Sequence, residues 1–246
     1  AACHHRNSSV RAHAAAVLGV IGAADIAPAL KELLRDEDEE VRLVAVAGIL
    51  GLASEVALFT LTDVALHDTA HAQALAIATL GNFGGWEAFQ TLRQCAHLPD
   101  PGARKAAALA LMNVSDNQET PAILEQLLLH DDDWSVCMAA TKSLAGCGLA
   151  GVGPLRNALH SDFWAIQEAA LASLEEHGSF AVPTLVALLE CEADMNARIA
   201  TVQCLRRMGT TAAEAVPALA KLSHQGAPAL RCEALAALGA IGPAAA

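Results

Sequence analysis

The sequence of 246 residues has no tyrosine, and aromatic residues make up only 3% of it, although 54% of its residues are hydrophobic. Its apolar content is therefore mainly Ala, Leu and Val; Ala and Leu favour helices, and Ala lets helices pack closely. No apolar run reaches the roughly 20 residues that a membrane span needs, and the first residues lack the apolar segment of a signal peptide. We expect a helical protein with no membrane partner.

Cysteine pairs and basic residues are also scarce. The seven cysteines are odd in number and form no C-x-x-C motif, which predicts reduced, mostly buried thiols in a cytoplasmic protein. The 15 Lys and Arg stand against 27 Asp and Glu, a formal charge of −12. Because a nucleic-acid binder normally presents a basic face, we expect no DNA or RNA partner.

A repeat of about 31 residues is the strongest pattern present. Within each repeat one segment has apolar or small residues at its first, fifth, ninth and twelfth places, one face of a three-turn helix. Glycine closes six of the eight segments, as expected at the end of a helix: Gly22, Gly84, Gly148, Gly178, Gly209 and Gly242. The eight segments begin at Val10, Val41, Ala72, Ala103, Val136, Ile166, Ala197 and Leu230.

Another helix is expected before each segment, followed by an acidic turn that can cap the next helix. Prolines are expected near the start of these helices, where a missing N–H costs little: Pro28, Pro121, Pro154, Pro183 and Pro217. The pattern predicts an all-α, right-handed α-solenoid of about eight helical hairpins, with residues 1–246 as one repeat domain. Since solenoid ends need polar caps and the outer segments are apolar, we expect further residues at one end or end-to-end self-association.

The pattern "D…VR..AA..L..IG" resembles the armadillo-like HEAT repeat, in particular the short HEAT-like repeats of phycobilisome lyases. The Arg at the second place is replaced by Gln73, Cys137 and Gln167, so an Asp–Arg ladder would be broken there. The resemblance implies an architecture shared by scaffolds, transport receptors, chromophore lyases and hydroxylases. Deoxyhypusine hydroxylases of this type bind a di-iron centre through His-Glu dipeptides, and this sequence contains none.

In such a stack the second helix of each hairpin lines the concave side, and its third, fourth, seventh and eleventh places face the groove. The first half of this predicted face is largely apolar, and the second half carries both charges. As an alternative, Leu43, Val44 and Leu75 are partly buried by neighbouring helices. We predict partner contacts at His13, Val20, Leu43, Val44, Leu75, Asn82, Lys105, Leu109, Asn113, Met138, Lys142, Glu168, Glu176, Gln203, Arg207 and Glu233.

Other patterns give no catalytic, cofactor or metal site. Histidines recur at one repeat position, but stacked helices lie about 8–10 Å apart and cannot share one ion; we expect them at helix ends, near carbonyl groups. Trp134 and Trp164 share a repeat position and either cover an edge of the stack or anchor a partner. The recurring histidines are His4, His97, His130, His160 and His224, with His67 one residue out of phase.

We therefore expect a non-catalytic protein–protein interaction scaffold or adaptor that binds a peptide or protein surface in the concave groove, with no cofactor. The alternative is a phycobilin-lyase-like protein, or a chaperone for a chromophore or its client. An exposed apolar patch in a groove favours the first interpretation.

Overall fold

The computed structural model of the protein describes residues 2–114, 117–159, 161, 163–191 and 195–242. All regular structure in these ranges is helical. The chain divides into two compact units, Ala1–Val114 and Ser115–Ala246, hereafter unit 1 and unit 2. The single repeat domain expected for residues 1–246 stays a prediction.

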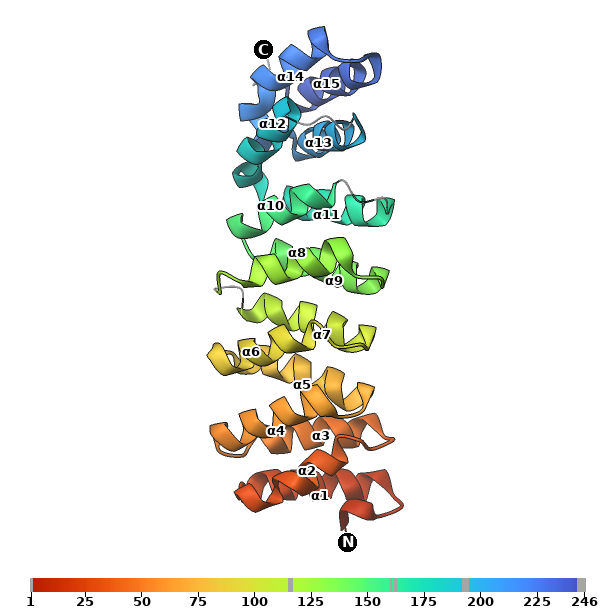
Figure 1. The fold of residues 1–246 in the computed structure, drawn as a ribbon, viewed down its shortest axis with the longest axis vertical. Helices are drawn as coiled ribbons and strands as arrows, with labels where there is room; N and C mark the ends of the chain where they lie inside the picture. The colour runs from red at the N-terminus through yellow and green to blue at the C-terminus, as the bar shows by residue number, and fades with distance from the viewer. Residues whose placement is uncertain (1, 115–116, 160, 162, 192–194, 243–246) are drawn as a thin grey trace. The chain divides into compact units, whose positions relative to one another are not determined.

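Unit 1 is a stack of hairpins built on α1 (Figure 1). Its α-helices are α1 (Ser8–Ile21), α2 (Ala27–Leu33), α3 (Glu39–Leu50), α4 (Ser54–His67), α5 (Ala70–Phe83), α6 (Gly85–Cys95) and α7 (Pro101–Leu111). Short 3-10 helices lie at η1 (Ala2–His4), η2 (Ala24–Ile26) and η3 (Met112–Val114).

Unit 2 repeats the same design. Its α-helices are α8 (Thr120–His130), α9 (Trp134–Ala145), α10 (Leu149–Ala158), α11 (Trp164–Glu176), α12 (Val182–Cys191), α13 (Met195–Met208), α14 (Val216–Gln225) and α15 (Pro228–Ile241). The 3-10 helices η4 (Gly178–Ala181) and η5 (Gly209–Ala215) precede α12 and α14.

All eight predicted segments lie in odd-numbered helices, and the helices expected before them are the even-numbered ones. Within each unit the odd helices pack on one another and the even helices form a second layer, as α2 and α4 do in unit 1. From the second segment onward the first and fifth places are buried in every segment; Val41, Ala45 and Ile49 are inaccessible to solvent. The prediction is wrong for the residues at the ninth or twelfth place that are only half-buried: Phe83, Val114, Cys147, His177 and Leu238. It is also wrong for the first segment, where Val10 and Ile21 are exposed. There α1 packs on α3, and its buried residues include Ala12 and Ala15, which lie on a different side of the helix from Val10 and Ile21.

The predicted helix ends are confirmed at three acidic turns but not at Asp68, because α5 begins after Thr69 with no side-chain cap. The carboxylates of Asp38, Asp100 and Asp133 accept hydrogen bonds from backbone N–H groups at the starts of α3, α7 and α9. Asp162 and Asp194, expected to act in the same way, lie outside the described residues. Each of the six closing glycines has a positive φ between 56° and 75°, where a side chain would be strained: Gly22, Gly84, Gly148, Gly178, Gly209 and Gly242.

Pro154 departs from the predicted pattern, because it lies inside α10 rather than at its start. The helix begins at Leu149, directly after Gly148, and so one turn earlier than the proline would suggest. Pro28, Pro121 and Pro217 occupy the first turn of their helices, as expected.

Cys95 and Cys204 are buried, free thiols, Cys137 is also buried, and Cys232 is exposed. Burial raises the pKa of Cys95 and Cys204 to about 12, so both stay protonated thiols. None of the helices in the described part of the chain is long and apolar enough to cross a membrane.

In five of the eight segments the second place contacts a backbone carbonyl six residues earlier. Arg42 donates from Nη1 to Asp36 O at 2.8 Å, and Gln167 donates from Nε2 to Ser161 O at 2.7 Å. At the sixth segment an amide N–H takes the place of the guanidinium in this contact with a backbone carbonyl, so the contact does not depend on Arg. The same contact joins Arg11 to His5 O, Arg104 to Leu98 O and, through its thiol, Cys137 to Asp131 O.

Glycine permits the closest approach of two helices in unit 1. A Cβ added at Gly19 on α1 would lie 2.5 Å from Gly48 Cα on α3. Such a separation is too short for two carbon atoms, so a side chain at this position would force α1 and α3 apart.

Gly19→Ala should therefore destabilise unit 1 by about 1–3 kcal/mol, measured by denaturant unfolding. Gly239 is a matched control, because it too is the third residue from the end of its helix and a Cβ there meets nothing within 4 Å. Gly239→Ala should leave stability unchanged or raise it by up to about 1 kcal/mol. Equal effects of the two changes would show that the α1–α3 approach is not tight.

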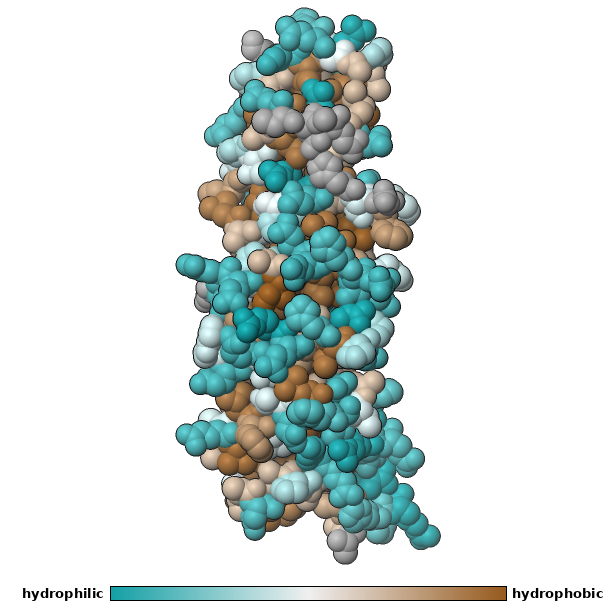
Figure 2. All heavy atoms as spheres, viewed as in Figure 1, coloured by the Kyte–Doolittle hydropathy of each residue, from teal (hydrophilic) through white to brown (hydrophobic). Residues whose placement is uncertain are grey.

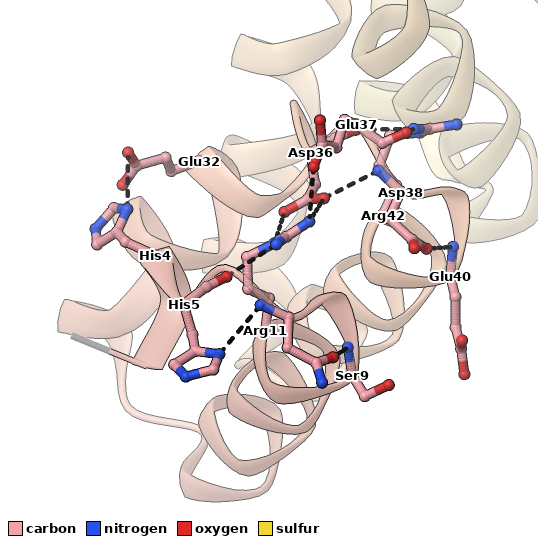
Figure 3. Close-up of polar contacts among 11 residues, drawn as sticks. His4, His5, Ser9, Arg11, Glu32, Asp36, Glu37, Asp38, Glu40 and Arg42 are labelled. Atoms are coloured by element: carbon pink, nitrogen blue, oxygen red, sulfur yellow. Dashed lines mark hydrogen bonds and ion pairs between the residues drawn. The ribbon is translucent and has the colours of Figure 1, made fainter.

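Ion pairs join successive hairpins of unit 1, and the best shielded is Arg11–Asp36 (Figure 3). Arg11 donates to both carboxylate oxygens of Asp36, at 2.6 and 2.7 Å, and the two side chains are 10% and 8% exposed. Lys31 pairs with Asp63 in the same way, and Arg35 with Asp68. The hydrogen bond from Arg11 holds the pKa of Asp36 below its usual value, although burial of the carboxyl opposes it.

This shift sets the direction of a pH effect. Because the pKa of Asp36 is lower in the folded than in the unfolded chain, the contribution of the pair is complete above about pH 4 and is lost as the pH falls through the lower folded value. Asp36→Asn should lower the thermal midpoint at pH 7, and the gap to the wild type should shrink toward pH 2–3. A gap that stays constant with pH would contradict this assignment.

Candidate functional site

The predicted groove positions are all accessible to solvent in the structure, and none is buried. In unit 1 they lie on α1 (His13 and Val20), α3 (Leu43 and Val44), α5 (Leu75 and Asn82), α7 (Lys105 and Leu109) and η3 (Asn113). In unit 2 they lie on α9 (Met138 and Lys142), α11 (Glu168 and Glu176), α13 (Gln203 and Arg207) and α15 (Glu233). Val44, Leu75, Met138, Gln203 and Glu233 are half-buried and the others are exposed.

A shallow pocket of about 310 Å³ lies between α3 and α5 of unit 1 and brings together two of the predicted residues, Leu43 and Leu75. Ala74 and Ala78 complete its apolar wall, and Glu39, Arg42 and His71 form its rim. Leu43 is 52% exposed, so the pocket offers apolar surface to a partner. The structure does not bring Val20, Val44 or Leu109 into this pocket.

The sequence analysis missed five residues of this pocket. Ala74 and Ala78 lie on α5 beside Leu75, and they face Leu43 of α3 across the pocket. In the sequence, alanines were interpreted as packing residues between helices. Arg42, at the second place of its segment, was expected to contact the acidic turn, and it donates from Nη1 to Asp36 O and Glu37 O there. Its position next to Leu43 could have identified it as a rim residue, because a side chain held by the turn can still cover the start of the groove.

The second half of the predicted face is held by contacts among its own charged groups. Arg207 on α13 lies 2.6 Å from Glu168 and 2.6 Å from Glu175, both on α11. On the next pair of helices Glu233 accepts from Gln203 at 3.4 Å and pairs with Arg206 at 3.3 Å. Four of the polar residues that we expected to meet a partner therefore brace neighbouring repeats of unit 2: Glu168, Gln203, Arg207 and Glu233.

Glu175 is the most perturbed of these carboxyls. Burial raises its pKa, and the nearby Arg207 only partly offsets that effect. In unit 1 a neutral contact plays the bracing role, since Asn113 Nδ2 donates to Asn82 Oδ1 at 3.1 Å.

A second hollow, of about 670 Å³, lies beside η1 and α2 in unit 1. Its charged groups are largely paired: Arg11 with Asp36 and Glu37, and His4 with Glu32 at 3.8 Å (Figure 3). Figure 2 shows hydrophilic side chains gathered at this edge, near the N-terminus, and apolar ones among them elsewhere on the drawn face of unit 1. Because its charged side chains are paired with one another, this hollow is a weaker candidate for a binding site than the apolar pocket.

The recurring histidines do not form a ligand set. Within the described residues there is no group of three or more His, Cys, Asp or Glu side chains that could hold a metal ion. His67 interacts with its own helix end, as expected, with Nδ1 3.2 Å from Asp63 O. His160 lies outside the described residues.

Comparison with known proteins agrees with this geometry. The profile of HEAT repeats matches residues 1–73, 69–145 and 152–239. The chain belongs to the HEAT-repeat family. It is therefore an all-α HEAT solenoid, as the sequence predicted; the match is to HEAT repeats in general and does not distinguish the phycobilisome-lyase type. No curated protein matches this HEAT chain.

Solved structures share this HEAT fold at low sequence identity. Kap121p bound to Nup53p matches with a TM-score of 0.54 at 15% identity, over 98% of this chain and 32% of that one. YibA of E. coli matches with a TM-score of 0.51 at 15% identity, over 98% and 90%. Human deoxyhypusine hydroxylase has a TM-score of 0.43 at 22% identity, over 93% and 90%. This HEAT chain thus spans about a third of Kap121p.

Removing Arg207 should destabilise unit 2 through Glu175. In Arg207→Leu the half-buried carboxylate loses its cation, so its folded pKa should rise further above the unfolded value, and the ionised form should cost stability as the pH increases. The thermal midpoint should therefore fall more at pH 8 than at pH 5. Arg206→Leu is the control, and its effect should be smaller because Gln203 still contacts Glu233; an equal effect would argue against a special role for Arg207.

Proposed function

We propose that the protein is a scaffold of the HEAT-repeat family that binds a peptide or protein partner on unit 1, with one or two apolar side chains of the partner seated between α3 and α5. The observation that carries the proposal is the pocket of about 310 Å³ with Leu43 and Leu75 in its wall. Its volume suits one or two aliphatic or aromatic side chains. Burying one such side chain contributes about 1.5–3 kcal/mol, which is a typical contribution for an interface anchor.

The rim adds direction to this contact. Glu39, Arg42 and His71 surround the apolar wall, so a partner that presents an apolar residue flanked by polar ones meets apolar and polar surface in matching places. The structure of Kap121p bound to Nup53p supports the proposal in general terms, because it pairs a HEAT-like stack with another protein. A cytoplasmic, reducing location is part of the proposal and suits the unpaired thiols.

The lyase-like alternative has less support. It needs free carboxylates and aromatic rings together in the groove, whereas Glu168 is paired with Arg207 at 2.6 Å. The half-buried Glu175 is bound to the same guanidinium. We therefore propose a non-catalytic role for this face.

The test is affinity capture from the source cell with four immobilised proteins: wild type, Leu43→Glu, Leu75→Glu and Leu235→Glu. Leu235 is a control of the same residue type, 59% exposed but on α15 of unit 2. A true partner should be retained by wild type and Leu235→Glu and lose about 1–3 kcal/mol of binding free energy in each of the other variants, measured by calorimetry with the identified protein.

Thermal melting followed by circular dichroism should show nearly the same midpoint for all four proteins. If Leu43→Glu and Leu75→Glu unfold the protein, the two leucines are core residues and the assignment of the face is wrong. If every captured protein is retained equally by all four, the pocket is not the binding site.

A further inference from the structure

Aromatic side chains are placed on the outside of this protein. The sequence has only eight of them, and Phe89 alone is buried. An Ala- and Leu-rich core leaves little space for large rings, so most of the aromatic residues do not contribute to it. Exposed aromatic rings are typical of binding surfaces. Six are more than half exposed: Phe59, Trp86, Trp134, Phe163, Trp164 and Phe180.

Three of these six lie at one edge of unit 2. Trp134 is the first residue of α9, and Phe163 and Trp164 stand at the start of α11. They are 66%, 65% and 76% exposed, so they do not cover the seam between repeats, which was one of the two expectations for Trp134 and Trp164. The two helices pack on one another, and packed helices lie about 8–10 Å apart, so one extended segment can reach all three rings.

The sequence on either side of these rings carries acidic residues and no basic ones. The sequence has no Lys or Arg at 106–141 or at 157–197, and the turn before α9 is Asp131, Asp132 and Asp133. Asp133 caps α9 and offsets the positive end of its dipole, and Asp132 is an exposed residue two positions before Trp134. Residues 115–246 hold 15 of the 27 acidic residues and 7 of the 15 basic ones, so they carry −8 of the formal charge of −12.

We propose that the surface formed by Asp132, Trp134, Phe163 and Trp164, the aromatic edge, binds a lysine- or arginine-bearing segment of a partner protein. A cation over a tryptophan face is attracted by the ring, and the aliphatic stem of Lys or Arg packs on aromatic surface. The acidic surroundings draw such a segment in and repel nucleic acid. A second copy of this chain is disfavoured, because it would bring a second acidic edge against the first.

This surface is separate from the pocket of unit 1, so the two proposals stand or fall independently. The aromatic edge lies wholly within unit 2, and its occupant is chosen by charge rather than by apolar volume.

The test uses three fluorescein-labelled peptides of 12 residues: one of Gly, Ser, Lys and Arg, the same peptide with Gln at every basic position, and one with Leu there. Binding is measured by fluorescence anisotropy at pH 7.5. The basic peptide should bind, and the Gln and Leu peptides should not. In the double variant Trp134→Ala, Trp164→Ala the dissociation constant should rise by about 10-fold.

Asp132→Lys tests the charge while leaving the rings in place, and it should weaken binding by about 3-fold or more and reduce the salt dependence. Phe180→Ala is the matched control, because Phe180 is 71% exposed in unit 2 but belongs to η4, and it should bind like the wild type. Melting curves from circular dichroism should coincide for all proteins, since every changed side chain is exposed.

Four results would overturn the proposal: equal binding of the Gln peptide, tighter binding of the Leu peptide, an equal loss in Phe180→Ala, or no binding of the basic peptide at millimolar concentration. Sedimentation of the unlabelled chain adds a fifth, because a dimer that the double tryptophan variant abolishes would make a second copy the occupant.

Discussion

The contact that recurs in both units is the hydrogen bond from the second place of a segment back to a carbonyl six residues earlier, which five of the eight segments make. That carbonyl belongs to the turn before the helix or to the end of the preceding helix, where backbone acceptors lack helical partners. Arg42, Gln167 and Cys137 all make it, so the position needs a donor and not a charge. Holding the turn at both ends fixes where the next helix starts, and this sets the spacing of the repeat.

The architecture could be predicted from the sequence because it depends on short-range periodicity. Residues such as Val41, Ala45 and Ile49 lie on one helix face whatever the rest of the chain does. Glycines with positive φ and capping carboxylates are equally local, so they were identified correctly. Pro154 was misplaced because a helix start is decided by the preceding turn as well as by the proline.

The site could be predicted only in part, because its contacts do not follow the repeat. Arg207 reaches Glu168 across 39 residues, and no spacing rule for equivalent positions contains that pair. The long side chain reaches a carboxylate on the neighbouring helix, so two charges that we expected to meet a partner are already paired with each other. Leu43 and Leu75 could be predicted because a short aliphatic side chain stays on the helix face from which it starts. Arg42 and His71 at the rim could not, because the position of a longer side chain depends on its rotamer.

The outward placement of the rings also has a spectroscopic consequence. Trp86, Trp134 and Trp164 are 58%, 66% and 76% exposed in the folded chain, and there is no tyrosine. Indole emission responds to the transfer of the ring between protein interior and water, and these rings are already largely in water. Tryptophan emission should therefore change little when the core unfolds. It should change when a bound partner covers one of the rings.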